Sequence, residues 1–308
     1  MNRQLTALTG STVLALAALV PTAADAHPQA AANACYVWQG GIDGVGGHHF
    51  STPTASSPPT VMDNWGTPGV YKSGAVRLSS RQTMETDIDG YDNYGYVVIA
   101  DALYYSYYLR PADGTVKYQS LTRLGGGWAG FRYLEVSQYQ SPEGTTPNVS
   151  RAASYALRSD GVLFRWNVLG GKIWRVSGSY PGFSAVKTMT LIAKTPTYDT
   201  FLANTRGGAL YTIRIPTTSP VKPVVRQVRT SGWQRFEALM TMACGRNGNL
   251  LLALDKDADS PKAYLYAVGH ANGLSTVIQP RGQVPAAPGY PVDFRWVQLP
   301  VYDVANGD

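Results

Sequence analysis

The stretch Gly232-Trp233-Gln234-Arg235-Phe236-Glu237-Ala238-Leu239 decides the fold, because related stretches recur along the chain. Each copy carries a phenylalanine, and successive phenylalanines lie 52 (183 − 131), 53 (236 − 183) and 58 (294 − 236) residues apart. In the first three copies an aromatic residue stands three positions before the phenylalanine, and in the last copy it stands four before. A period of roughly 40–55 residues built from short strands is typical of β-propeller blades. The repeat therefore predicts a propeller.

The composition agrees with an all-β protein. The chain of 308 residues contains 32 Gly, 20 Pro and 20 Tyr, and only 15% of its residues are charged. Glycine and proline favour turns, whereas tyrosine favours strands. Apolar segments are short and are separated by Gly or Pro, and no long stretch has helical spacing. We expect a single all-β domain over residues 27–308.

The repeat predicts five four-stranded antiparallel blades. Four are continuous, and the fifth would be a composite of both chain ends, in which Phe294–Leu299 resembles the first strand of a full blade. Joining the ends in one blade closes the ring and removes two exposed sheet edges. The predicted boundaries are 74–124, 125–178, 179–230 and 231–282, with 33–73 plus 290–303 as the composite blade.

The N-terminus has the pattern of a secretory signal peptide. Arg3 precedes the mostly apolar run Leu5–Val20, and Ala24-Asp25-Ala26 is a cleavage motif. We expect residues 1–26 to be removed and the protein to be secreted to the extracellular space. No other segment is long and apolar enough for a membrane span. The interval His48–Pro68 is rich in Ser, Thr, Pro and Gly and is expected to be a long surface loop.

The two cysteines, Cys35 and Cys244, are predicted to form a disulfide, because an even pair in an oxidising compartment is usually bonded. The bond would close a loop of 209 residues (244 − 35). In the chain-entropy model such a loop contributes about 4–5 kcal/mol of stability. The alternative is a pair of buried free thiols.

The copy at Gly232–Leu239, followed by Asn247-Gly248-Asn249-Leu250, resembles the repeat of the tachylectin family. The resemblance covers roughly residues 125–296 and implies a five-bladed lectin that binds N-acetylated amino sugars. Here Tyr180 replaces the family tryptophan in one copy, and Tyr290 is displaced in another. The blades are also longer than those of the family. Such lectins resemble those of antibacterial umbrella toxin particles, so subunits of a secreted assembly are further candidate partners.

The aromatic residues of the repeat are the predicted glycan-binding residues. Sugars present apolar C–H faces and hydroxyls, so an aromatic ring beside polar groups makes a suitable site. Weak sites repeated on one frame would gain avidity for a polymer. The alternative is that these rings only pack blade on blade, and the repeated phenylalanines are expected in the core. The predicted ligand-binding residues are Trp128, Tyr180, Trp233 and Tyr290.

Catalysis is not expected from the sequence. There is no nucleophile-elbow Gly-x-Ser-x-Gly motif. His48 and His49 are adjacent, so on a strand they would point to opposite faces and could not share a metal. The acidic loops Asp255–Asp259 and Asp87–Asn93 are interpreted as polar turns, so we expect no metal and no cofactor. The alternative is a propeller glycoside hydrolase or lyase. The carboxylates available for it are Asp87, Asp89, Asp101, Glu135 and Glu237.

The net charge of +6 is scattered along the chain. No run of Lys and Arg has the density of a phosphate-binding stripe, so nucleic acid is not an expected partner. The expected function is a secreted, non-catalytic lectin whose partners are glycans. A third reading is a structural or targeting subunit of a secreted toxin assembly, which predicts a large apolar patch on one face.

Overall fold

The computed structural model describes residues 34–220, 222–285 and 289–299. The predicted signal peptide, residues 1–26, and residues 33 and 300–303 of the predicted composite blade lie outside the described residues. The described part contains twenty β-strands and one short 3₁₀ turn at Gly273–Ser275. The all-β expectation is confirmed, and the topology is consistent with a β-propeller.

Three separate four-stranded antiparallel sheets form from continuous segments. The first is β8 (Phe131–Gln140), β9 (Ser150–Arg158), β10 (Leu163–Leu169) and β11 (Ile173–Tyr180). The second is β12 (Val186–Lys194), β13 (Tyr198–Thr205), β14 (Leu210–Pro216) and β15 (Val224–Arg229). The third is β16 (Ala238–Ala243), β17 (Asn249–Asp255), β18 (Lys262–Val268) and β19 (Ile278–Val284).

The remaining strands form one eight-stranded sheet in the order β3-β2-β1-β20-β4-β5-β6-β7. One half is β4 (Val76–Asp87), β5 (Gly90–Ile99), β6 (Ala102–Arg110) and β7 (Lys117–Gly126). The other half, called here the composite group, is β1 (Gln39–Ile42), β2 (His48–Thr54), β3 (Thr60–Thr67) and β20 (Val292–Leu299). Strands from the two ends of the described chain are therefore neighbours, because β1 pairs antiparallel with β20.

The eight-stranded sheet differs from the expectation of separate blades. Strand β4 is twelve residues long, and its second half pairs in parallel with β20, from Trp296 opposite Gln82 to Leu299 opposite Glu85. These backbone hydrogen bonds join two four-stranded groups at their innermost strands. A shorter β4 would have left them as separate sheets.

The expectation of a long surface loop at His48–Pro68 is wrong. Most of this interval forms the hairpin β2–β3, and every residue of β2 except His49 is buried. Phe50 of β2 stacks on Trp65 of β3 with ring centroids 5.1 Å apart. Threonine and aromatic residues favour strands, so these pairings outweigh the turn-like composition of the segment.

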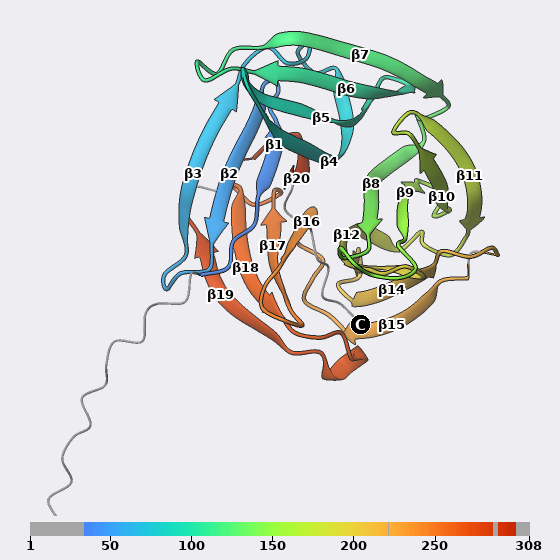
Figure 1. Cartoon of the computed structure of the whole chain (residues 1–308). Coiled ribbons are helices and arrows are strands. Elements are labelled where there is room, and N and C mark those ends of the chain that lie inside the picture. Colours follow the sequence, from blue (N-terminus) through green and yellow to red (C-terminus); the bar gives the residue numbers. More distant parts are fainter. Residues whose placement is uncertain (1–33, 221, 286–288, 300–308) are drawn as a thin grey trace, which may run out of the picture. The chain divides into compact units, whose positions relative to one another are not determined.

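Hydrophobic clusters lie between successive four-stranded groups. One cluster joins the composite group to β4–β7, and others join β4–β7 to β8–β11, β8–β11 to β12–β15, and β12–β15 to β16–β19. A further cluster joins β16–β19 to the composite group through Val37 and Val61. Within residues 34–299 the innermost strands β4, β8, β12, β16 and β20 also contact one another in this order (Figure 1).

Burial falls from the inner strands to the outer ones. Strand β17 is buried along its whole length, whereas most of β7 is exposed. A strand buried on both faces reads as a continuous apolar run, here Leu250 to Leu254. The innermost strands contact one another, and residues on and beside them line the candidate site.

Candidate functional site

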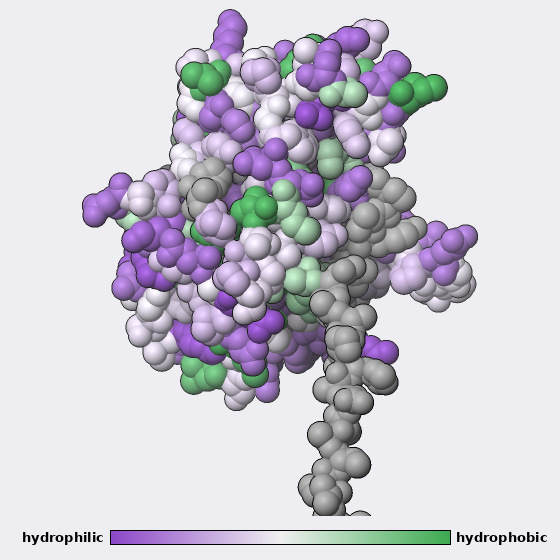
Figure 2. Space-filling view, turned by 90° about the vertical axis from the view of Figure 1, so that its left-hand side faces the viewer, coloured by the Kyte–Doolittle hydropathy of each residue, from purple (hydrophilic) through white to green (hydrophobic). Residues whose placement is uncertain are grey.

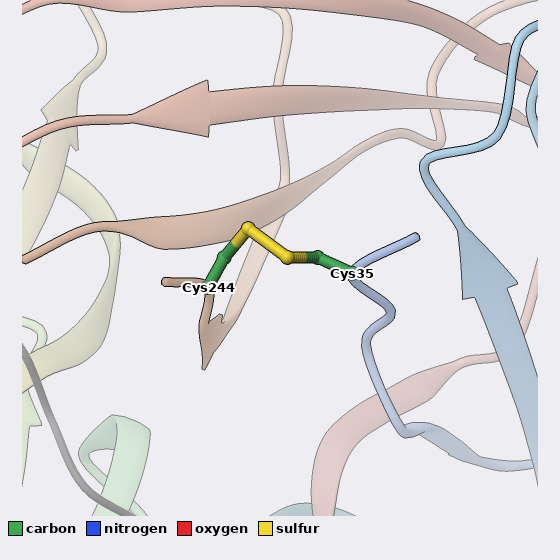
Figure 3. The surroundings of a disulfide bond; sticks show 2 residues. All are labelled: Cys35 and Cys244. Atoms are coloured by element: carbon green, nitrogen blue, oxygen red, sulfur yellow. A yellow bond between two sulfur atoms is a disulfide. The ribbon is translucent and has the colours of Figure 1, made fainter. Parts of the chain in front are cut away.

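The predicted disulfide is confirmed. Cys35, on the segment before β1, is bonded to Cys244, which follows β16, with their Cα atoms 5.6 Å apart (Figure 3). The bond links the composite group to the sheet β16–β19, within the cluster that also contains Val37. Its role here is to hold together two parts of the fold that lie far apart in the sequence.

The two tryptophans predicted to bind glycans are buried. Trp128 is 6% exposed and Trp233 is 7% exposed. The ring of Trp128 lies 5.5 Å from that of Trp166, and the ring of Trp233 lies 5.1 Å from that of Tyr266. Each also belongs to a cluster shared with the preceding sheet. These positions fit the alternative in which the rings pack between sheets.

The two predicted tyrosines have different surroundings. Tyr180, at the end of β11, is 37% exposed. Tyr290 stacks on His49 with ring centroids 4.6 Å apart, and His49 Nε2 lies 2.7 Å from a carboxylate oxygen of Asp43. The four predicted residues therefore do not form equivalent sites.

A polar cavity of about 170 Å³, called here the axial cavity, lies among the innermost strands. Its lining comes from β4, β8, β12, β16 and β20 and from the segments that adjoin them. Three carboxylates, Glu135, Glu237 and Asp293, line it. Several cations line it as well, namely Arg77, Arg81, Arg132, Lys256 and Arg295. Charged groups with little access to water are costly unless they are paired, so such a concentration is typical of a functional site.

Lys256 lies between two of these carboxylates. Its backbone N–H donates to Glu237 Oε2 at 2.6 Å, and its Nζ donates to Asp293 Oδ2 at 2.8 Å. Glu237 also forms an ion pair with Lys187 through its other oxygen. The arrangement gives Glu237 strong donors to both of its oxygens, whereas Asp293 has a donor to only one.

The same cavity shifts the pKa values of these two carboxyls in opposite directions. Burial raises the pKa of Asp293 to about 6, although Lys256 works against this rise. Burial alone would also raise the pKa of Glu237, but the hydrogen bonds from Lys187 and from the Lys256 N–H hold it below its ordinary value. Near neutral pH one group is therefore close to its titration point and the other is ionised.

Some buried polar atoms of the cavity lining have no hydrogen-bond partner among the described residues. They are Asp293 Oδ1, the Tyr133 hydroxyl and Arg132 Nε. Leaving such a group unsatisfied costs about 1–3 kcal/mol, so each requires an explanation. A bound polar molecule that accepts from Tyr133 and Arg132 and contacts Asp293 would supply the missing partners.

The carboxylates named from the sequence separate into two sets. Glu135 and Glu237 line the axial cavity, whereas Asp101 accepts hydrogen bonds from the backbone N–H groups of Gly127 and Ala129 and so shapes a turn. Asp87 and Asp89 lie at an exposed hairpin. Sequence reasoning missed Asp293. Its position directly before the repeated Phe294, on a first-strand copy, was the available signal.

The histidine pair behaves as expected for neighbours on a strand. His48 is buried, its Nδ1 lies 3.0 Å from the Tyr108 hydroxyl, and burial lowers its pKa to about 3. His49 is directed instead to Asp43. Within the described ranges, no group of three or more His, Cys, Asp or Glu could hold a metal ion. Over the same ranges, no helix is long and apolar enough to cross a membrane.

No protein-family model matches the chain, and a search of curated protein sequences finds no match. Among solved structures, the chain is similar to an α-L-arabinofuranosidase of Podospora anserina in complex with cellotriose. The TM-score is 0.45 and the identity 12%, over 84% of this chain and 79% of that one. It is also similar to a periplasmic gluconolactonase of Pseudomonas aeruginosa, with a TM-score of 0.35 and 9% identity, over 80% of this chain and 98% of that one. Both of those proteins are enzymes, and the expectation that this protein is not an enzyme is not retained.

Proposed function

We propose that the protein is a glycoside hydrolase whose active site is the axial cavity. The observation that carries the proposal is the pair Asp293 and Glu237, two carboxyls of one cavity whose pKa values are shifted in opposite directions. Two carboxyl groups with different protonation states are what glycoside hydrolysis requires. The hydroxyls of a sugar would satisfy the unpartnered atoms of Tyr133 and Arg132.

The proposed roles follow from the surroundings of each group. Asp293, protonated below about pH 6, donates its proton to the leaving glycosidic oxygen. Glu237, held ionised by Lys187 and Lys256, acts on the anomeric carbon directly or through a water molecule. Ligand pockets commonly measure about 300–1,000 Å³, so a cavity of about 170 Å³ suits one sugar unit better than a chain interior. Removal of a terminal sugar is therefore the proposed reaction.

The proposal includes the finer architecture inferred from the sequence. We infer five blades, with the composite group as the fifth and a ring closed at the β1–β20 pairing. Contacts between successive innermost strands and a hydrophobic cluster between each pair of neighbouring groups support this count. Secretion is retained as part of the proposal, and the disulfide is the feature that supports it.

Release of sugar from a panel of aryl glycosides and cell-wall polysaccharides tests the proposal. With a responsive substrate, Asp293→Asn and Glu237→Gln should each lower kcat at least 100-fold, the usual range for loss of a general acid or base. Asp259→Asn, which makes the same change at an exposed loop position, is the matched control. Activity should fall as pH rises through about 6, where Asp293 loses its proton. Unchanged turnover in both cavity variants would contradict the proposal.

Glycan recognition at the outer strand β11 is a second candidate function, favoured by the exposed ring of Tyr180. The tachylectin resemblance and the toxin-assembly context belong to this reading, as do the predicted platforms Trp128, Trp233 and Tyr290. Figure 2 shows one face on which hydrophilic residues predominate and hydrophobic ones form small separate groups, so that face offers no support for a purely structural subunit. Titrating the wild type and Tyr180→Ala with N-acetylated sugars tests this site, because the variant should bind them more weakly.

A further inference from the structure

A larger cavity, of about 550 Å³, lies outside the axial site, at one end of strands β8, β9 and β10. It is called here the lateral cavity. Its lining includes Gln138 of β8, Arg151 of β9, Arg165 and Asn167 of β10, and Thr217, which follows β14 of the neighbouring sheet. The axial and lateral cavities have no lining residue in common.

A buried charge network reaches the lining of the lateral cavity through Arg151 and Arg165. Asp199 of β13 is fully buried and forms an ion pair with Arg151, with two nitrogens of the guanidinium on its two oxygens at 2.8 and 2.9 Å. It also accepts from the Tyr155 hydroxyl at 2.6 Å and from Ser137 at 2.7 Å. The single carboxylate of this network is therefore fully engaged.

Arg165 adds a second guanidinium without a second carboxylate. The residue is only 3% exposed. Its Nε donates to the Tyr155 hydroxyl at 3.1 Å, and its Nη1 donates to the Ser177 hydroxyl and the Thr217 carbonyl. Within the described part of the chain, no carboxylate forms an ion pair with Arg165, and its Nη2 makes no hydrogen bond.

The charges of this network are therefore unbalanced. Arg151 and Arg165 carry two positive charges against the one negative charge of Asp199. A guanidinium removed from water is costly without a counter-charge, and its planar donors match a carboxylate. An anion in the lateral cavity would balance the charge of Arg165 and supply an acceptor for Nη2.

The other lining groups indicate what carries the anion. The amide groups of Gln138 and Asn167 can donate and accept, as sugar hydroxyls require, and the backbone of Gly170 and Gly171 leaves the wall open. A volume of about 550 Å³ exceeds what a small inorganic ion needs. We propose that the lateral cavity binds an acidic sugar of the uronic acid class, with its carboxylate on Arg165. The proposal does not depend on catalysis in the axial cavity.

Titration of the full-length protein with D-glucuronate at low ionic strength, followed by NMR, tests this site. D-glucose and inorganic phosphate are the comparison probes. Glucuronate should bind at least tenfold more tightly than either, and its affinity should fall as salt is added. Arg165→Gln should weaken glucuronate at least tenfold.

Asn167→Asp keeps the proposal testable should Arg165→Gln fail to fold, because Asn167 is exposed and the change is nearly isosteric. A new carboxylate in the lining should weaken glucuronate at least tenfold, whereas Asn64→Asp, on the exposed part of β3, should leave it unchanged. Asp293→Asn should also leave this binding intact, which separates it from the proposed activity. Equal binding of glucose, equal binding of phosphate, or full affinity in Asn167→Asp would overturn the proposal.

Discussion

The sheet β16–β19 and the composite group are neighbours that reach four strands by different routes. The first is one continuous segment whose second strand, β17, is buried throughout and mostly apolar. The second joins β20 to β1, β2 and β3 and buries many polar side chains, among them Gln39, His48, Ser51 and Thr52. The strands of the continuous sheet supply a regular apolar core, with Glu237 and Lys256 just outside strands β16 and β17, whereas the composite group carries its site carboxylate, Asp293, within a strand.

The difference shows where function can be accommodated. Local hairpins form the continuous sheet, so its strand propensities, its apolar pattern and its turns all favour the same structure. The composite group depends on contacts between residues more than 240 positions apart, such as Trp296 Nε1 to the His49 carbonyl. Such pairing has a high entropic cost of loop closure. The disulfide, the packed glycines and the Lys256–Asp293 ion pair all act at this junction.

The largest expected effect comes from opening the disulfide between the two regions. Cys35→Ser should lower the free energy of unfolding by up to about 4–5 kcal/mol, because the unfolded chain loses a constraint over 209 residues. Chemical denaturation of the variant and of the wild type, both non-reduced, measures this. Cys244→Ser should have the same effect, and Cys35→Ser combined with Cys244→Ser should lose little more than either alone. An unchanged midpoint would show that other contacts already hold the junction.

The next effect concerns Trp233, which precedes the continuous sheet and packs in the cluster between that sheet and β12–β15. Trp233→Ala should cost about 3–5 kcal/mol of stability, since it empties a site packed against Phe236 and Tyr266. Exposed Tyr180→Ala, by contrast, should change stability by less than about 1 kcal/mol. Melting curves measured together with glycan titration separate packing from binding. If Trp233→Ala folds normally but loses about 1–3 kcal/mol of sugar affinity, Trp233 contacts the sugar directly, as the sequence predicted.

The composite group should give a pH-dependent effect opposite in sign to that of Glu237, which directly precedes the continuous sheet and whose pKa is lowered. Between pH 3.8 and about 6 folded Asp293 retains a proton that the unfolded chain has released, so stability falls as pH rises through this window. A pKa raised by about 2 units corresponds to about 3 kcal/mol. Asp293→Asn should remove this part of the pH dependence. The measurement is the free energy of unfolding at pH 4 and pH 7.5, with Asp259→Asn as a control that keeps the wild-type difference.

The sequence predicted the all-β fold because the stretch that indicates it is repeated along the chain. Phe131, Phe183, Phe236 and Phe294 are all buried, as expected, since each fills the same position against a neighbouring sheet. The cysteine pairing was predictable from parity and compartment alone. The β2–β3 hairpin was not, because its strands are held by long-range pairing that outweighs a composition typical of loops.

The candidate site was predictable only in part, since its residues are the ones that the repeat does not fix. Glu237 follows one repeated phenylalanine and Asp293 precedes another, so no common motif marks the pair. The role of Lys256 depends on a contact with Asp293 across 37 positions. The same repeat drew attention to Trp128 and Trp233, and both of these side chains are buried.

The smallest expected effect concerns the close packing of the composite group. A Cβ atom added at Gly41 would lie 1.9 Å from a ring carbon of Tyr290, so Gly41→Ala must push that ring away from His49. Overpacking of this kind costs about 1–3 kcal/mol. Gly44→Ala is the matched control, because nothing lies within 4 Å of its added Cβ. Thermal unfolding gives the cost, and the NMR shifts of the His49 ring report whether the stack with Tyr290 is lost. If Gly41→Ala and Gly44→Ala have the same melting temperature and the His49 shifts are unchanged, the Tyr290 ring can move without a cost in stability. It could then also contact a ligand.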